Sequence, residues 1–198
     1  MSARDDILAR VREAVSDAPE VAEPPRDYRR APELAGEDLL AQFVERVEDY
    51  RATVTRCTEA EVPRELERLL DGVLRVVVPD GFPWSVPGGE PDNAKSAAEL
   101  NDVDAVVTTS SVGIAETGTV VLSHGPGQGR RALSLVPDLH VCVIHADQVV
   151  AGVNEAVGML DPLQPQTWIS GPSATSDIEL SRVEGVHGPR TLHVLLVE

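Results

Sequence analysis

The sequence has 198 residues, a formal net charge of −16 and 42% hydrophobic residues, with a pI near 4.6. This length is typical of one globular domain with one core. The strong negative charge repels phosphate backbones and anionic lipids, so it excludes nucleic-acid binding and membrane-surface binding as main roles. The sequence has no apolar run of transmembrane length and no signal-peptide core, which predicts a cytoplasmic protein without a membrane span.

Residues 1–36 are predicted to form an extension that is separate from the main domain, residues 37–198. Apolar side chains at helical spacing predict a short amphipathic helix, with a face formed by Ile7, Leu8, Val11, Ala14 and Val15. Residues 17–36 are rich in proline, alanine and charge, which is typical of an extended linker. The tethered helix can pack on the body or dock on a partner, and we expect the first.

The main domain alternates predicted helices and strands along the chain. We expect helices at residues 39–47, 62–70, 94–100 and 148–160. We expect strands at residues 52–56, 73–78, 105–108, 119–122, 141–144, 167–170 and 192–197, most of which are continuously apolar. This alternation predicts an α/β fold with a largely parallel sheet and helices on both faces.

A long irregular loop is expected at residues 79–91. It contains Phe82 and Trp84, which are half of the phenylalanine and tryptophan residues of an aromatic-poor chain. Aromatic side chains in a loop favour a lid or a partner contact. Packing of the loop on the body explains the same residues equally well.

A first candidate site follows the strand expected at residues 105–108. Hydroxyl groups and free backbone amides at a strand-to-helix turn can bind a carboxylate or a phosphate, and ligands of α/β sheets bind beyond the carboxyl ends of strands. Thr117 and Gly118 are therefore predicted ligand-binding residues, and Glu116 is a catalytic candidate. The alternative is that Glu116 orients a loop or pairs with an arginine.

Two arginines end the glycine-rich segment 125–131, which has neither the P-loop order nor the dinucleotide-binding spacing. A guanidinium group binds a carboxylate through two parallel hydrogen bonds, so Arg130 and Arg131 are predicted to bind a small hydroxy or keto acid. In an acidic protein, surface ion pairs are the alternative role for such a pair.

A third candidate segment lies between residues 171 and 190. His187 is flanked by glycines and can act as an acid or a base near neutral pH. Ser173, Thr175 and Asp177 are predicted to form an anion-binding turn at the start of a short helix, with Arg190 nearby, although a helix cap explains Asp177 alone. An ordinary surface turn is the alternative. We expect four candidates to converge at one end of the sheet: Glu116, Arg130, Arg131 and His187.

Four blocks, at residues 113–122, 137–144, 171–179 and 185–197, together resemble the LUD-domain family, and within it the lactate-utilisation protein C group. This resemblance implies a fold like that of CoA transferases and sugar-phosphate isomerases. It also implies a role, together with two partner proteins, in the oxidation of L-lactate to pyruvate. CoA transferases use a glutamate nucleophile on this fold, and Glu116 is similar to it in general setting.

The two cysteines, Cys57 and Cys142, form no Cys-x-x-Cys pair, so this chain alone is not expected to hold an iron–sulfur cluster or another cofactor. Zinc-site spacing is also missing. Together with the resemblance, this favours a non-redox subunit of an iron–sulfur system, with the clusters on partner subunits. Two alternatives remain. One is an autonomous CoA-transferase-like or isomerase-like enzyme acting on a small carboxylate or phosphate, and the other is a ligand sensor without turnover.

Overall fold

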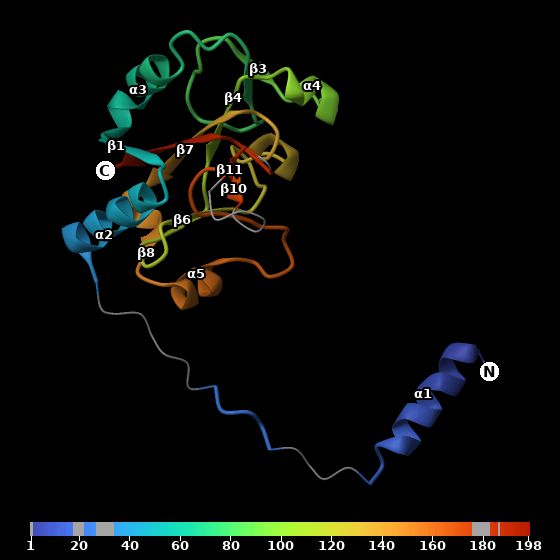
Figure 1. The fold of residues 1–198 in the computed structure, drawn as a ribbon. Coiled ribbons are helices and arrows are strands. Elements are labelled where there is room, and N and C mark those ends of the chain that lie inside the picture. Colours follow the sequence, from blue (N-terminus) through green and yellow to red (C-terminus); the bar gives the residue numbers. More distant parts are fainter. Residues whose placement is uncertain (1, 18–21, 27–33, 176–182, 186) are drawn as a thin grey trace.

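The computed structural model describes residues 2–17, 22–26, 34–175, 183–185 and 187–198 (Figure 1). Its helices are α1 (Ala3–Ala14), α2 (Gly36–Asp49), α3 (Val62–Leu69), α4 (Ala97–Asn101) and α5 (Val153–Met159), with 3-10 turns at Glu59–Glu61, Arg131–Ser134 and Ala146–Gln148. Its strands are β1 (Thr53–Cys57), β2 (Val76–Val78), β3 (Gly89–Pro91), β4 (Ala105–Thr109), β5 (Val112–Ile114), β6 (Thr119–Leu122), β7 (Leu139–His145), β8 (Val149–Val150), β9 (Thr167–Ile169), β10 (Ala174–Thr175), β11 (Val183–Glu184) and β12 (Thr191–Val197).

The main sheet has six strands in the order β1-β12-β7-β4-β2-β3, and each neighbouring pair is parallel. The central strands β7 and β12 are the longest and are almost entirely buried. Their continuous apolar runs fit this position, because a central strand of a parallel sheet is covered on both faces. The α/β class and the largely parallel sheet predicted from the sequence are confirmed.

Both faces of the main sheet are covered, because successive side chains of a strand point to opposite faces. On one face, Cys142 and Val194 pack with Phe43 of α2 and with strands of a second sheet. On the other face, Val143 packs with Leu66 of α3. Figure 1 shows α2 and α3 at separate positions around the sheet, and the expectation of helices on both faces is confirmed.

A second sheet of four strands, ordered β8-β5-β6-β9, covers part of the α2 face. Two sequence expectations fail here. The strand-to-helix turn predicted after residues 105–108 is wrong: β4 is followed by β5 and β6, which pair antiparallel as a hairpin, and Gly118 closes the turn of this hairpin with a φ of 58°. The helix expected from residue 148 begins only at Val153, because Val149 and Val150 pair with β5.

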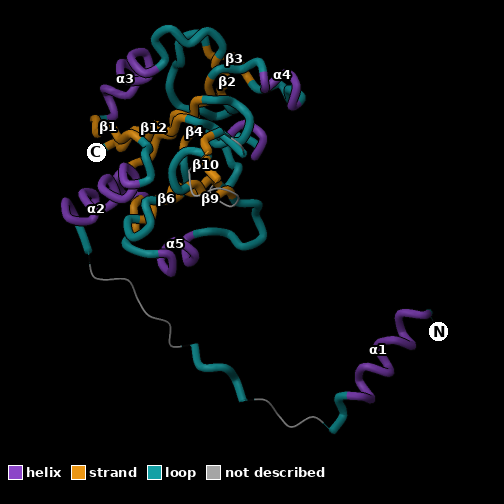
Figure 2. The backbone as a smooth tube through the Cα atoms, viewed as in Figure 1, coloured by secondary structure: helices purple, strands orange, loops and turns teal. Residues whose placement is uncertain are grey.

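Helix α1 stands apart from the body. The Ser2 side chain caps it in a capping box with Asp5, and none of its residues is buried. Figures 1 and 2 both show it remote from the two sheets, so the structure does not show the expected packing on the body. Among the described residues, no helix is both long and apolar enough to cross a membrane.

Candidate functional site

A cavity of about 700 Å³ opens at the carboxyl edge of the main sheet. Three loops line it: residues 79–81 directly after β2, residues 92–94 directly after β3, and residues 124–130 after β6. The carboxyl edge is where open α/β sheets bind their ligands, and the volume lies within the usual range for ligand sites. This position makes the cavity, named here the carboxyl-edge cavity, the first candidate for a functional site.

Backbone strain is concentrated at the carboxyl-edge cavity. Asn93, Ala94 and His124 have φ values of 45°, 55° and 59°, and all three residues line the cavity. The only other non-glycine residue with positive φ in the described ranges is Arg51. The left-handed region costs a non-glycine residue about 1–3 kcal/mol, and such conformations cluster at functional sites. The strained residues therefore support the assignment of a site here.

Arg130 forms one wall of the cavity through a fork-shaped ion pair. Its Nε and Nη2 lie 2.6 and 2.8 Å from the two carboxylate oxygens of Asp92, and Nη2 also donates to the carbonyl oxygen of Lys95. The Arg130 guanidinium holds the pKa of Asp92 below its usual range. The fork that the sequence assigns to a ligand carboxylate is thus occupied by Asp92. Nη1 is the nitrogen of Arg130 without a partner among the described residues.

His124 adds an imidazole to the cavity. Its Nδ1 lies 2.9 Å from the carbonyl oxygen of Gly129, and its Nε2 lies 2.9 Å from Oγ1 of Thr167. A carbonyl oxygen only accepts hydrogen bonds, so Nδ1 donates to Gly129, while Nε2 is paired with the Thr167 hydroxyl. His124 was not among the site residues predicted from the sequence. The feature of the sequence that could have indicated His124 is its position two residues after a buried strand and directly before the glycine-rich segment.

The glycine-rich segment packs against the loop that follows β2. Gly127 donates its N–H to the carbonyl oxygen of Asp80 at 2.7 Å, and its own carbonyl oxygen accepts from the N–H of Thr109 at 2.8 Å. A Cβ atom at Gly81 would lie 2.8 Å from Cβ of Pro126. These glycines therefore let two loops approach closely beside the cavity, which is a structural reason for the motif.

The predicted residues Glu116, Thr117 and Gly118 form the tip of the β5–β6 hairpin, away from the carboxyl-edge cavity. Glu116 is exposed, and its backbone N–H donates to the carbonyl oxygen of Ala151 at 3.0 Å. The Thr117 hydroxyl lies 2.7 Å from that of Thr119. His124 follows the carboxyl end of β6, whereas Glu116 precedes its amino end, so strand β6 separates the two side chains.

Four other predicted residues lie near the amino edge of the sheet: Arg131, Ser173, His187 and Arg190. Arg131, Ser173 and His187 line a cavity of about 340 Å³. His187 and Arg190 line another, of about 600 Å³, and Arg190 forms an ion pair with Asp138, with Nε 2.6 Å from Oδ1. Asp138 directly precedes β7 and Arg190 directly precedes β12, which places this pair at the amino edge.

The structure thus distributes the predicted residues over three surfaces: the hairpin tip, the carboxyl edge and the amino edge. Ser173 accepts the backbone N–H of His187 at 3.0 Å through its hydroxyl oxygen, which joins two of the candidates. Thr175 ends the short strand β10. Asp177 and the short helix expected there lie outside the described residues.

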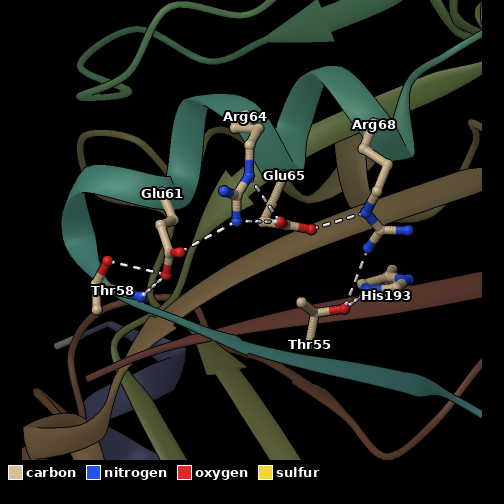
Figure 3. A network of polar contacts seen from close by, with 7 residues as sticks. All are labelled: Thr55, Thr58, Glu61, Arg64, Glu65, Arg68 and His193. Carbon is tan, nitrogen blue, oxygen red and sulfur yellow. Dashed lines mark hydrogen bonds and ion pairs between the residues drawn. The ribbon is translucent and has the colours of Figure 1, made fainter.

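A second polar cluster, on α3, links that helix to the sheet (Figure 3). Glu65 accepts hydrogen bonds from Arg64 and Arg68, and Nη2 of Arg68 lies 3.5 Å from Oγ1 of Thr55 on β1. Thr55 in turn lies 2.8 Å from Nε2 of His193 on β12, and burial lowers the pKa of His193 to about 4. Because every partner is another side chain of the same fold, we interpret this cluster as structural.

The loop at residues 79–88 packs on the body instead of standing free. Phe82 and Trp84 contact each other edge to face, with ring centroids 5.3 Å apart, and both lie against the core on the α3 face. Trp84 also stacks on His145 and donates its indole N–H to Glu59 at 3.0 Å. Of the two roles considered for these aromatic residues, the structure shows the packing role.

Neither cysteine is exposed. Burial raises the pKa of Cys57 above its usual value and that of Cys142 to about 12, so both thiols are held in the protonated form at neutral pH. In the part of the chain that the structure describes, no group of three or more histidine, cysteine, aspartate or glutamate side chains is arranged to hold a metal ion.

Comparison with known proteins gives consistent matches. The LUD domain family profile matches residues 78–197. A Deinococcus radiodurans protein named Lactate utilization protein C is 43% identical over 98% of this chain and 95% of its own length. A protein of the same name from Shouchella clausii is 33% identical over 54% of this chain and 49% of its own. The crystal structure of a DUF162 family protein from Deinococcus radiodurans is 40% identical, with a TM-score of 0.72, over 83% of this chain and 99% of that one. The chain therefore belongs to the LUD domain family.

Proposed function

We propose that this lactate-utilisation protein is a non-redox subunit of a cytoplasmic iron–sulfur system that oxidises L-lactate to pyruvate. The observation that carries the proposal is the 43% identity, over nearly the whole chain, to a protein named Lactate utilization protein C. At this identity and coverage, the two chains share both the α/β domain and the N-terminal part. A role in lactate utilisation is therefore the function with the strongest support.

The assignment of the redox centres to partner subunits rests on the thiols of this chain. An iron–sulfur cluster is held by deprotonated cysteines, usually four of them. This chain has two cysteines, both buried, and burial raises the pKa of each. Partner subunits with cysteine motifs would supply the clusters, while this chain would bind or position a substrate or a partner.

We further propose that the carboxyl-edge cavity binds a small hydroxy or keto acid. Nη1 of Arg130 offers a charged donor for a carboxylate, and the Asn93 amide can donate to a hydroxyl or keto oxygen. The Asp92–Arg130 pair fixes this donor in place, which lowers the entropy cost of binding. A cavity of about 700 Å³ is larger than a three-carbon acid needs, so it leaves room for part of a partner subunit.

A growth experiment tests the physiological role. Deletion of the gene from its host should abolish growth on L-lactate and leave growth on pyruvate intact, because only the first carbon source requires the oxidation step. Re-expression of the wild-type chain should restore growth on L-lactate. Equal growth of the deletion strain on both carbon sources contradicts the proposal.

A biochemical experiment separates the subunit role from an autonomous enzyme. The purified chain should show no L-lactate oxidation on its own, and activity should appear only when cysteine-rich partner proteins encoded by neighbouring genes are added. Turnover of an acyl-CoA or a sugar phosphate by the isolated chain would favour the CoA-transferase-like or isomerase-like alternative.

A further inference from the structure

Helix α1 presents an apolar stripe that none of the described residues covers. Ile7, Val11 and Val15 recur every four residues, and their exposed fractions are 62%, 53% and 56%. Leu8 extends the same stripe. A helix of 12 residues is marginal in water unless its apolar face packs against something. The sequence of α1 therefore calls for a docking surface.

The body carries an apolar groove that the described residues also leave uncovered. Val157 of α5, Leu160, Pro162 and Trp168 of β9 line a groove of about 490 Å³. Val157 and Trp168 are 57% and 39% exposed. Three further large apolar side chains nearby in the sequence are also exposed: Val153, Met159 and Leu163. Monomeric proteins rarely leave an apolar patch of this kind uncovered unless it binds something.

The wall of this groove is held in place by hydrogen bonds. The indole N–H of Trp168 donates to Oε1 of Gln166 at 3.0 Å, and Nε2 of Gln166 donates to the carbonyl oxygen of Asp161 at 3.1 Å. Oδ1 of Asp161 accepts the backbone N–H of Leu163 at 2.9 Å. The groove is thus formed before any partner binds, which favours docking of a preformed helix.

The charges of α1 match those around the groove. Arg10 and Arg12 flank the apolar stripe of α1 on its two sides, and Arg4 lies in line with the stripe, one turn before Ile7. Asp6 and Glu13 lie on the opposite face, and Asp5, beside Arg12, is engaged with Ser2 in the capping box. One acidic residue, Asp161, is exposed and lies between the lining residues Leu160 and Pro162. An arginine at the edge of a docked α1 would meet this carboxylate.

The connection between α1 and the body permits docking on the same chain. The 21 residues between Ala14 and Gly36 span up to about 70 Å when extended. The body end of this linker is α2, which contacts β8, and β8 also contacts α5. Figure 1 shows the linker leaving α2 on the side where α5 lies. A tether of this length raises the effective concentration of α1 at the groove to about the millimolar range.

We infer that α1 docks, through its apolar stripe, in the groove between α5 and β9 of its own chain. In the docked state the stripe of Ile7, Leu8, Val11 and Val15 covers Val157, Leu160 and Trp168. The arginines beside the stripe then lie close to Asp161. In this state α1 covers the groove.

Crosslinking in the full chain tests the inference. Val11→Cys combined with Val157→Cys should form an intramolecular crosslink with a short bismaleimide at least ten times faster than Ala9→Cys combined with Val157→Cys. Ala9 is the matched control because it is on the same helix and tether but shares the opposite face with Asp6 and Glu13. Both native cysteines are buried and should not compete. Equal rates for the two pairs, or no crosslink in either, overturn the inference.

The oligomeric state of the crosslinked product identifies the occupant. A product that migrates as a monomer supports docking on the same chain, whereas a predominantly dimeric product places α1 in the groove of a second copy and overturns the inference as stated. A second measurement needs no cysteine. Val11→Asp should speed hydrogen exchange of backbone amides in residues 157–168 about tenfold, and Ala9→Asp should leave it unchanged. Unchanged exchange in both variants also overturns the inference.

Discussion

The side chains of Arg130 and Asp92 meet in a two-pronged ion pair across the carboxyl-edge cavity, with N···O distances of 2.6 and 2.8 Å. Asp92 directly follows the edge strand β3, whereas Arg130 ends the glycine-rich segment, so the pair joins two loops that are 38 residues apart in sequence. The cavity wall therefore depends on this contact. Arg130→Lys should weaken it, because an ammonium group cannot form both hydrogen bonds in the same plane.

Replacing Asp92 should destabilise the protein in a pH-dependent manner. Asp92→Asn removes the charged acceptor and should lower the free energy of unfolding at pH 7 by about 1–3 kcal/mol. Arg130 lowers the pKa of Asp92 in the folded state, so this contribution is present above the ordinary aspartate pKa and is lost as the pH falls through the lowered value. Urea unfolding of wild type and Asp92→Asn between pH 7 and pH 2 checks the direction of this pH dependence. Asp71→Asn is the control, because Asp71 is exposed. If the difference in the free energy of unfolding between wild type and Asp92→Asn is the same at both pH values, the charge of Asp92 does not stabilise the fold.

The buried imidazole of His140 should make the protein less stable in mild acid. Burial lowers the pKa of His140 to about 4, and Nε2 lies 2.8 Å from the Thr108 hydroxyl. The unfolded chain therefore binds more protons between about pH 6.5 and 4, so stability falls as the pH drops through this window. Between pH 7 and pH 5 the loss from His140 should be about 2 kcal/mol. His140→Gln should reduce the loss in urea titrations at the two pH values, and an unchanged pH dependence contradicts this assignment.

Two glycine substitutions test whether close packing against α2 restricts the residue at position 118. A Cβ atom at Gly118 would lie 2.4 Å from the backbone carbon of Arg46, and the φ of 58° disfavours other residues. Gly118→Ala should therefore lower the free energy of unfolding by about 2–4 kcal/mol. A Cβ atom at Gly125 would meet nothing within 4 Å, so Gly125→Ala is the matched control and should be nearly neutral. Similar thermal unfolding of both variants would show that α2 does not restrict Gly118.

Much of the fold could be predicted from the sequence because its strongest signals are local. The apolar run at residues 141–144 lies in β7, and the run at residues 192–197 lies in β12, at the centre of the sheet. The β5–β6 hairpin was missed because its turn, with Gly118, also suits a strand-to-helix connection. The second sheet also needs a strand from far along the chain, because Val121 of β6 pairs with Trp168 of β9.

The candidate site was harder to predict because loops that are far apart in sequence form it, and their meeting at one edge of the sheet depends on the strand order. Arg130 and Arg131 are adjacent in sequence, yet Arg130 lines the carboxyl-edge cavity and Arg131 lines the cavity shared with His187. No local pattern reveals that Asp92 occupies the Arg130 fork. The positive φ of His124 also has no signature in the sequence, because it results from the loop packing around the ring. Catalytic roles for Glu116 and His187 stay predictions.

Complementation of a deletion strain on L-lactate tests the central claim most directly. Wild type and the exposed control Glu67→Gln should restore growth on L-lactate. His124→Asn and Arg130→Lys should fail or grow at least tenfold more slowly, although both variants accumulate as folded proteins. Asparagine tolerates the left-handed backbone of position 124 and retains a side-chain N–H, so folding should survive there. Full growth with both cavity variants contradicts a role for the carboxyl-edge cavity in lactate utilisation.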